Sequence, residues 1–284
     1  PSHIIERLPM HRNVKSISTQ NTKDLSKSLI SFCNASSPFE KFGLKEVRNY
    51  EWPKKGKSVD LLISDYDSKF SISGDNNYEK NVALKRLIQS KYQNRELNNR
   101  SISEWIIKEW GGIKKISKNL DEYISAVERK ELPQNLSGVA SYSKLFAMFY
   151  PDEFAIFDAR VAVSLNIIQL LSAEKSAVFF PYLGGRNKWT GDQVNKRGFS
   201  SISHFKRDSI NTTSTKTWEF IPEYRVYAFY NNILLNIAEA SKWQLMDIEM
   251  LLFSQAEKLV QKIHNDKRFS FVDWSSLPNQ PDYL

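Results

Sequence analysis

Residues 136–165 read LSGVASYSKLFAMFYPDEFAIFDARVAVSL, and no other stretch of the chain is as informative about its fold. A turn of small residues leads into a helix that carries Lys144. Pro151 ends that helix, because proline has no backbone N–H to donate to the preceding turn. The apolar run at residues 154–157 then delivers Asp158 to the start of another helix. The pattern predicts a compact helical unit that brings a lysine and an aspartate close together.

Apolar residues recur at helical spacing on both sides of this unit. They predict helices around residues 25–33, 82–88, 102–110, 120–127, 222–238 and 245–264. The helix around 102–110 is expected to be capped by Ser101 or Ser103 and to stop at Gly111-Gly112. Residues 37–80 are the least helical part, and the alternating run at 59–63 predicts a short strand among loops. The fold class expected is therefore mainly α.

The chain divides by composition into two parts. Residues 1–80 are expected to form an N-terminal arm and an irregular, mixed region that packs on the body. Residues 81–284 are expected to form a helical domain, interrupted by a long basic loop at 183–216 with several glycines and few aliphatic residues. Loops of this length inside a domain are usually functional or disordered.

The bulk composition limits the classes of function. The net charge of +8 favours an anionic partner such as nucleic acid, although a solvated lysine-rich surface gives the same balance. A single cysteine, Cys33, excludes an intramolecular disulfide and a cluster held by four thiolates, and we expect it to be a buried thiol. The four histidines lack metal-ligand spacing, so no metal and no cofactor are expected. No apolar run reaches the ~18–20 residues that cross a bilayer, so a soluble, cytoplasmic protein is expected.

Asp158 and Lys144 are the candidate catalytic residues. A carboxylate is favoured at a helix N-terminus by the helix dipole and by free N–H groups, and it can deprotonate water or stabilise a developing cation. A lysine can contact a phosphate, or attack an electrophilic carbon when its pKa is depressed. The simpler alternative is that Asp158 is a helix cap and Lys144 a surface residue.

The same stretch resembles the signature of the helix-hairpin-helix DNA glycosylases, in particular the bacterial branch similar to 8-oxoguanine DNA glycosylase. The residues that carry the resemblance are Phe154-x-Ile156-x-Asp158-x-x-Val161-x-x-x-Leu165, joined by Trp110-Gly111-Gly112, Arg186-Asn187 and the segment Trp243–Phe253. It covers about residues 100–255. The hairpin has one glycine where the family usually has two, and Lys144 lies only 14 residues before Asp158, a shorter interval than usual. An ungapped alignment places Ala140 nearer to the position of the family's lysine.

The resemblance implies a helical glycosylase fold and a monomeric, nucleoid-associated enzyme. Such an enzyme binds double-stranded DNA and flips a damaged or modified base into a pocket. Asp158 would stabilise the sugar cation and orient the attacking group, which is water in a monofunctional enzyme and Lys144 in one with lyase activity. The hairpin at Ser137, Gly138 and Ala140 would offer N–H groups to a phosphate, directly or through a bound monovalent cation.

Further candidates surround this pair. The expected DNA contacts beyond the hairpin are Arg160, Arg186, Asn187, Lys188, Lys196, Arg197, Lys206 and Arg207. The expected base-pocket residues are Tyr142, Trp189, Phe199, Asp247 and Glu249. For Tyr142 burial in the core is the simpler interpretation, and for Asp247 and Glu249 it is a favourable interaction with the helix dipole.

The function expected is thus that of a DNA glycosylase that excises a damaged or modified base, with defence against modified foreign DNA as one setting. Two alternatives stay open. One is a non-catalytic nucleic-acid-binding module, and the other is a DNA-processing protein of a restriction or defence system.

Overall fold

The computed structural model describes residues 17–52, 58–114, 118–181, 183 and 216–264, and it is mainly helical. Its α-helices are α1 (Thr19–Cys33), α2 (Val59–Tyr66), α3 (Asn77–Gln93), α4 (Asn99–Trp105), α5 (Leu120–Arg129), α6 (Val139–Phe149), α7 (Ala159–Leu171), α10 (Glu223–Ala240) and α11 (Leu245–His264). A 3-10 helix, η1 (Leu44–Asn49), and a π-helical turn, η2 (Ile106–Trp110), complete the helices described. The mainly α class predicted from the sequence is confirmed.

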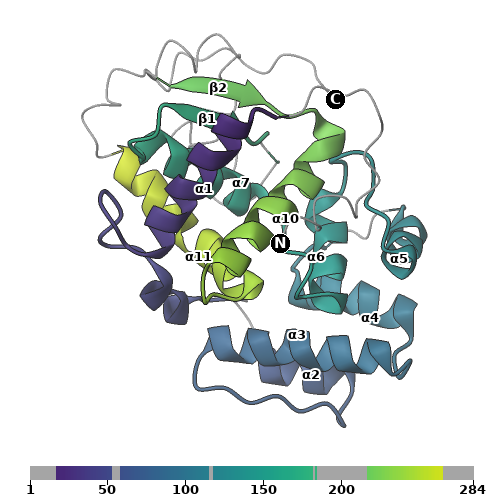
Figure 1. The fold of residues 1–284 in the computed structure, drawn as a ribbon. Coiled ribbons are helices and arrows are strands. Elements are labelled where there is room, and N and C mark those ends of the chain that lie inside the picture. The colour runs from purple at the N-terminus through teal and green to yellow at the C-terminus, as the bar shows by residue number, and fades with distance from the viewer. Residues whose placement is uncertain (1–16, 53–57, 115–117, 182, 184–215, 265–284) are drawn as a thin grey trace.

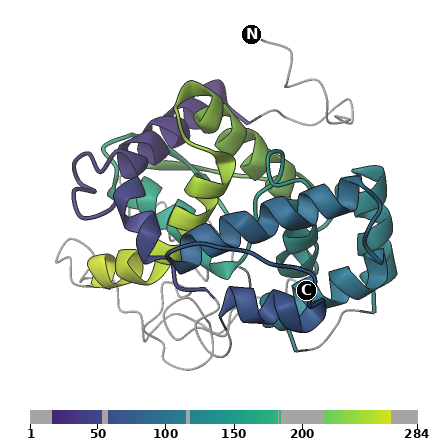
Figure 2. The same ribbon diagram turned by 90° about the horizontal axis from the view of Figure 1, so that it is seen from below.

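Two short strands, β1 (Ser176–Phe179) and β2 (Thr217–Phe220), form a parallel pair at one end of the molecule, and the sequence pattern did not predict them. Ser176 lies opposite Thr217, and Phe179 lies opposite Phe220. Figure 1 shows this pair at the end opposite to α2 and α3, with the other helices between. The view from below in Figure 2 shows α2 lying beside α3, which it contacts.

The central unit forms as the sequence predicts. Gly138 precedes α6 with a left-handed backbone (φ 73°), and α6 ends at Phe149, shortly before Pro151. Asp158 is extended and caps α7. α7 is buried almost all round, so it serves as the central helix of the core, and α11 packs along it.

The run at residues 59–63 is helical, which corrects the predicted strand. Val59 and Ile63 are both fully buried, whereas Leu61 between them is 52% exposed. Residues four apart share one face of a helix, while an alternating strand would bury all three. The burial of Val59 and Ile63 against the rest of the core therefore decides in favour of α2.

The helix around 102–110 also differs in detail from the prediction. Its cap is Asn98, whose side chain accepts a hydrogen bond from Ser101 N at 2.9 Å, and neither predicted serine caps it. The last turn widens into the π-helical η2 before Gly111, as expected for a stop at Gly111-Gly112. Wide turns of this kind often occur at functional sites.

The described part of the N-terminal region shares one core with the rest of the chain. α1 packs against α7, α10 and β1, and η1 packs against α11. Cys33 is buried in this core, and burial raises the pKa of its thiol to about 12. The residue is thus a small apolar group of the core, as the sequence indicated.

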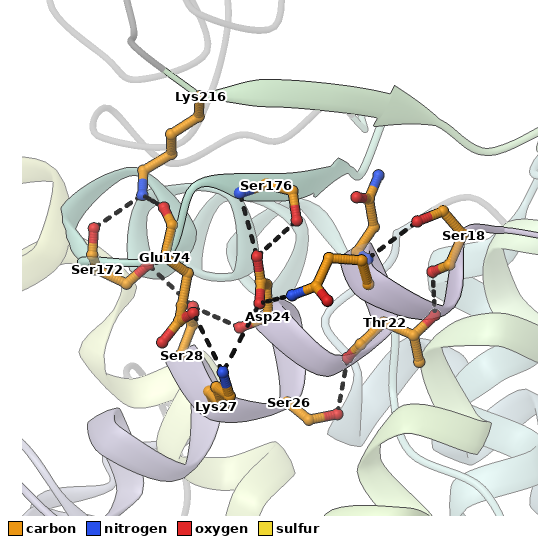
Figure 3. A network of polar contacts seen from close by, with 12 residues as sticks. Ser18, Thr22, Asp24, Ser26, Lys27, Ser28, Ser172, Glu174, Ser176 and Lys216 are labelled. Carbon is orange, nitrogen blue, oxygen red and sulfur yellow. Dashed lines mark hydrogen bonds and ion pairs between the residues drawn. The ribbon is translucent and has the colours of Figure 1, made fainter.

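A polar network ties α1 to the strand pair (Figure 3). The buried carboxylate of Asp24 accepts hydrogen bonds from the backbone N of Ser176 at 3.2 Å and from its hydroxyl at 2.6 Å. On the far side, Lys216 donates to the carbonyl oxygens of Ser172 and Glu174. The network thus holds the N-terminal end of β1 and the residue before β2 in place.

Among the described residues, no helix has both the length and the apolar character needed to cross a membrane.

Candidate active site

A small chamber lies where α6, α7 and α11 meet the segment that follows η1. Its volume is about 60 Å³, and its walls are formed by Tyr50, Trp52, Trp110, Gly111, Lys144, Ile156, Asp158, Val161, Glu249 and Phe253. The structure therefore brings Lys144 and Asp158 to one cavity, as the sequence predicted. The volume leaves room for a few water molecules.

Asp158 has one oxygen that is fixed and one that is available. Oδ1 accepts hydrogen bonds from the backbone N of Arg160 at 3.0 Å and of Val161 at 3.1 Å. Oδ2 has no hydrogen-bond partner among the described residues. The cap interpretation is therefore correct for Oδ1, while Oδ2 remains free to act on a molecule in the chamber.

Lys144 is buried, which rules out the surface-lysine alternative. Its Nζ donates to the carbonyl oxygen of Ala140, one helical turn earlier, at 2.5 Å. Burial lowers the pKa of Lys144, although the negative charges of Asp158 and Glu249 act to raise it. Lys144 thus has the environment of an amine whose charged form is disfavoured, which is a property of nucleophilic lysines.

Glu249 is the second carboxylate of the chamber. Its two oxygens each lie 2.8 Å from Nζ of Lys85 on α3, in an ion pair whose side chains are 0% and 3% exposed. Oε2 also accepts a hydrogen bond from the backbone N of Ile156 at 3.0 Å. Glu249 on α11 thus fixes the backbone at Ile156, two residues before Asp158.

Aromatic rings close the remaining sides. Trp52 Nε1 donates to the carbonyl oxygen of Trp110 at 3.0 Å, and Trp110 Nε1 donates to Asn81 Oδ1 at 2.8 Å. The ring of Phe253 lies between Tyr50 and Trp52, with centroid distances of 5.6 Å and 5.4 Å. These rings give the chamber apolar walls, and a less polar surrounding strengthens electrostatic interactions inside it.

A larger polar cleft of about 670 Å³ adjoins the chamber and shares Tyr50 and Phe253 with it. Many of its lining side chains are neutral amides or hydroxyls: Asn49, Asn76, Asn77, Ser254, Gln255 and Gln261. Gln255 Oε1 is buried and has no hydrogen-bond partner among the residues described. A buried acceptor of this kind costs about 1–3 kcal/mol unless a donor reaches it.

The predicted hairpin contacts lie at the N-terminal end of α6. Ser137 and Gly138 are exposed, and the backbone N of Ser137 donates to Asn135 Oδ1 at 2.9 Å. Gly138 provides no capping side chain, and the backbone N–H groups of Val139 and Ser141 donate instead to the carbonyl oxygens of Leu136 at 3.0 Å and Gly138 at 2.8 Å. Ala140 is half-buried and contributes its carbonyl to Lys144.

Three other predicted site residues have partners within the protein. Arg160 is buried, pairs with Glu257, and lies over the ring of Phe253 at 4.8 Å. Tyr142 belongs to the core and donates to the carbonyl of Asn135 at 2.8 Å, so it does not line the chamber. Asp247 accepts hydrogen bonds from Tyr78 and from the backbone N of Gln244, which matches the helix-end interpretation and places it outside the chamber. For Glu249 the helix-dipole interpretation is not sufficient, because this side chain lines the chamber and pairs with Lys85.

The remaining predicted residues belong to the basic loop. The candidates that lie outside the described residues are Arg186, Asn187, Lys188, Trp189, Lys196, Arg197, Phe199, Lys206 and Arg207.

Sequence reasoning missed Tyr50, Trp52, Lys85, Val161 and Phe253 as parts of a site. Lys85 carried a signal, because it lies between Leu84 and Ile88 in an apolar stripe. A charged residue on such a stripe is rarely buried without a partner. The two aromatic residues before position 53 carried none, since the segment has no periodic pattern.

Within the described ranges, no group of three or more histidine, cysteine, aspartate or glutamate side chains is placed to hold a metal ion. Comparisons with protein-family models, with curated proteins and with solved structures gave no significant match.

Proposed function

We propose that this protein is a DNA glycosylase that cleaves the N-glycosidic bond of a damaged or modified base. The observation that carries the proposal is that Asp158 and the buried Lys144 both line one small, aromatic-walled chamber. An ionised carboxylate beside a poised nucleophile, with little water present, suits a reaction that passes through a sugar cation.

The chemistry follows from the two side chains. As the bond from C1′ to the base nitrogen breaks, its electron pair leaves with the base, which takes a proton from solvent. Asp158 stabilises the positive charge that develops on the sugar. In the monofunctional reaction a water molecule in the chamber bonds to C1′ and gives its proton to Asp158. In the lyase reaction the amine of Lys144 bonds to C1′ instead, and a Schiff base follows.

The surroundings supply the parts that the substrate needs. The chamber is too small for a base, so the flipped base lies in the adjoining polar cleft, beside Phe253 and the unpaired acceptor of Gln255. The N-terminal end of α6, preceded by the exposed Ser137 and Gly138, is suited to a DNA phosphate. The net charge of +8 favours binding to the DNA backbone.

The test is an excision assay on duplexes that each carry one modified base, followed by alkali to break the strand at abasic sites. We expect breaks with the unaltered protein and their loss in Asp158→Asn, with DNA affinity retained. Asp121→Asn, an exposed substitution in the first turn of α5, is the matched control and should cleave normally. Binding of DNA without breaks on any substrate would instead favour the non-catalytic nucleic-acid-binding module.

The nucleophile is identified separately. Borohydride reduces a Schiff base to a stable covalent adduct, so trapping that disappears in Lys144→Met would assign the lyase reaction. Base excision without trapping would assign the reaction that uses water.

A further inference from the structure

The ion pair between Lys85 and Glu249 is buried without being required by the chemistry assigned to Asp158 and Lys144. Its members come from α3 and α11, 164 residues apart in the chain, and both are almost completely enclosed. Taking two charges out of water is expensive, and replacing such a pair by apolar residues often leaves stability unchanged or improved. Stability alone therefore does not explain why a charged pair occupies this position.

We propose that Glu249, clamped by Lys85, is a positioning residue that sets the charge state of Lys144 and fixes the approach to Asp158. This inference rests on the proposed function for its catalytic consequence, although its electrostatic part does not. The contacts that carry it are the two 2.8 Å bonds from Lys85 and the 3.0 Å bond from Ile156 N, all made by a carboxylate that lines the chamber with Lys144.

The ion pair of Lys85 and Glu249 acts on Lys144 through the net charge of the pair. Glu249 and Asp158 both favour the ammonium form of Lys144, while burial opposes it. Lys85 offsets most of the negative charge of Glu249, because its ammonium contacts both carboxylate oxygens. Removing either member of the pair therefore changes the charge near Lys144 by one unit, but in opposite directions.

Other groups near the chamber leave this balance unchanged. Burial raises the pKa of Tyr50 and of Tyr230 on α10 well above the ordinary value, so both stay neutral phenols. Arg160 on α7 is paired with Glu257. The charged side chains of η2, Lys108 and Glu109, are exposed to solvent.

The test follows the titration of Lys144 in the full-length protein. Lysine is labelled with ¹³C at Cε, and the signal lost in Lys144→Met identifies the residue. We expect Glu249→Gln to move the Lys144 midpoint down by about one pH unit, because a negative charge is lost and Lys85 is left unpaired. We expect Lys85→Met to move the midpoint up by about one pH unit, because Glu249 is left without its counter-charge.

The double variant Lys85→Met/Glu249→Gln removes both charges and should return the midpoint to within about half a pH unit of the unaltered protein. Lys91→Met and Glu96→Gln are the matched controls, since this pair involves the same helix α3 but lies on the surface. Shifts in the same direction for both single variants, or shifts no larger than those of the controls, would overturn the proposal. If Lys85→Met does not fold, the sign of the shift in Glu249→Gln decides alone.

Catalysis gives a second readout. The pH midpoint of borohydride trapping should follow the same opposite shifts as the titration. The opposite signs matter, because a role in stability alone would weaken both single variants in the same way. A protein that excises no base but shows the opposite titration shifts would contradict the proposed function and leave this inference standing. Excision of a base without those titration shifts would support the proposed function and overturn this inference.

Discussion

Gly111 and Lys144 are packed so closely that position 111 has no room for a side chain. A Cβ at this position would lie 2.9 Å from Cδ of Lys144, 2.7 Å from the carbonyl oxygen of Ile106 and 2.8 Å from that of Ile107. Gly111 thus forms the part of the chamber wall along which the lysine side chain extends.

Gly111→Ala should therefore lower the free energy of unfolding by about 1–3 kcal/mol and displace the Lys144 side chain. Urea denaturation measures the first effect and borohydride trapping the second. Gly112→Ala is the control, because Gly112 has φ +67° but only distant contacts with Trp52. It should lose stability through backbone strain and keep the trapping. Equal trapping in both variants would show that the Gly111 contact does not position Lys144.

The hairpin before α6 depends on Gly138 for two reasons. Its φ of +73° disfavours other residues, and a Cβ there would lie 1.9 Å from the hydroxyl oxygen of Tyr123. Gly138→Ala should lower stability by at least about 2 kcal/mol, since the left-handed backbone alone costs about 1–2 kcal/mol. Adding Tyr123→Phe should recover part of the loss in a thermal unfolding measurement, because the nearest atom is then Cζ at 2.8 Å. No recovery would mean that backbone strain accounts for the whole effect.

Asp158 has a structural and a proposed catalytic role that two substitutions separate. Its Oδ1 caps α7, and asparagine caps helices about as well as aspartate, whereas alanine does not. Asp158→Asn should keep stability within about 0.5 kcal/mol, and Asp158→Ala should lose about 0.5–2 kcal/mol, as measured by urea denaturation. Both should lose excision. An equal loss of stability in the two variants would contradict the capping role.

The Asp24 network predicts a pH dependence. Burial acts to raise the pKa of Asp24, but hydrogen bonds from Ser176 and Gln20 hold it below the ordinary 3.8. A carboxyl with a lowered pKa in the folded state stabilises the fold above 3.8, and this stabilisation is lost as the pH falls through the folded-state value. Thermal unfolding between pH 7 and pH 3 should show a stability advantage over Asp24→Asn that declines below about pH 4. A constant difference across this range would contradict the assignment.

The local structure of the central unit was predictable from its residues. The turn at Gly138, the end of α6 before Pro151 and the cap at Asp158 depend on backbone sterics and on hydrogen bonds between near neighbours. The same holds for α10 and α11, whose apolar spacing specifies one buried face. The run at 59–63 misled the prediction, because a short apolar run fits a strand and a buried helix equally well.

Local sequence patterns were thus enough to predict most of the helices, with α2 the exception, and the positions of Lys144 and Asp158 on them. Tertiary structure alone decided that Lys144 is buried, that Lys85 meets Glu249 across 164 residues, and that Tyr50 and Phe253 separate a small chamber from a polar cleft. The parallel pairing of β1 with β2 likewise depends on tertiary structure. The physical reason is range: propensity, capping and periodicity act within a few turns of one segment, whereas burial and charge pairing depend on which segments the core brings together.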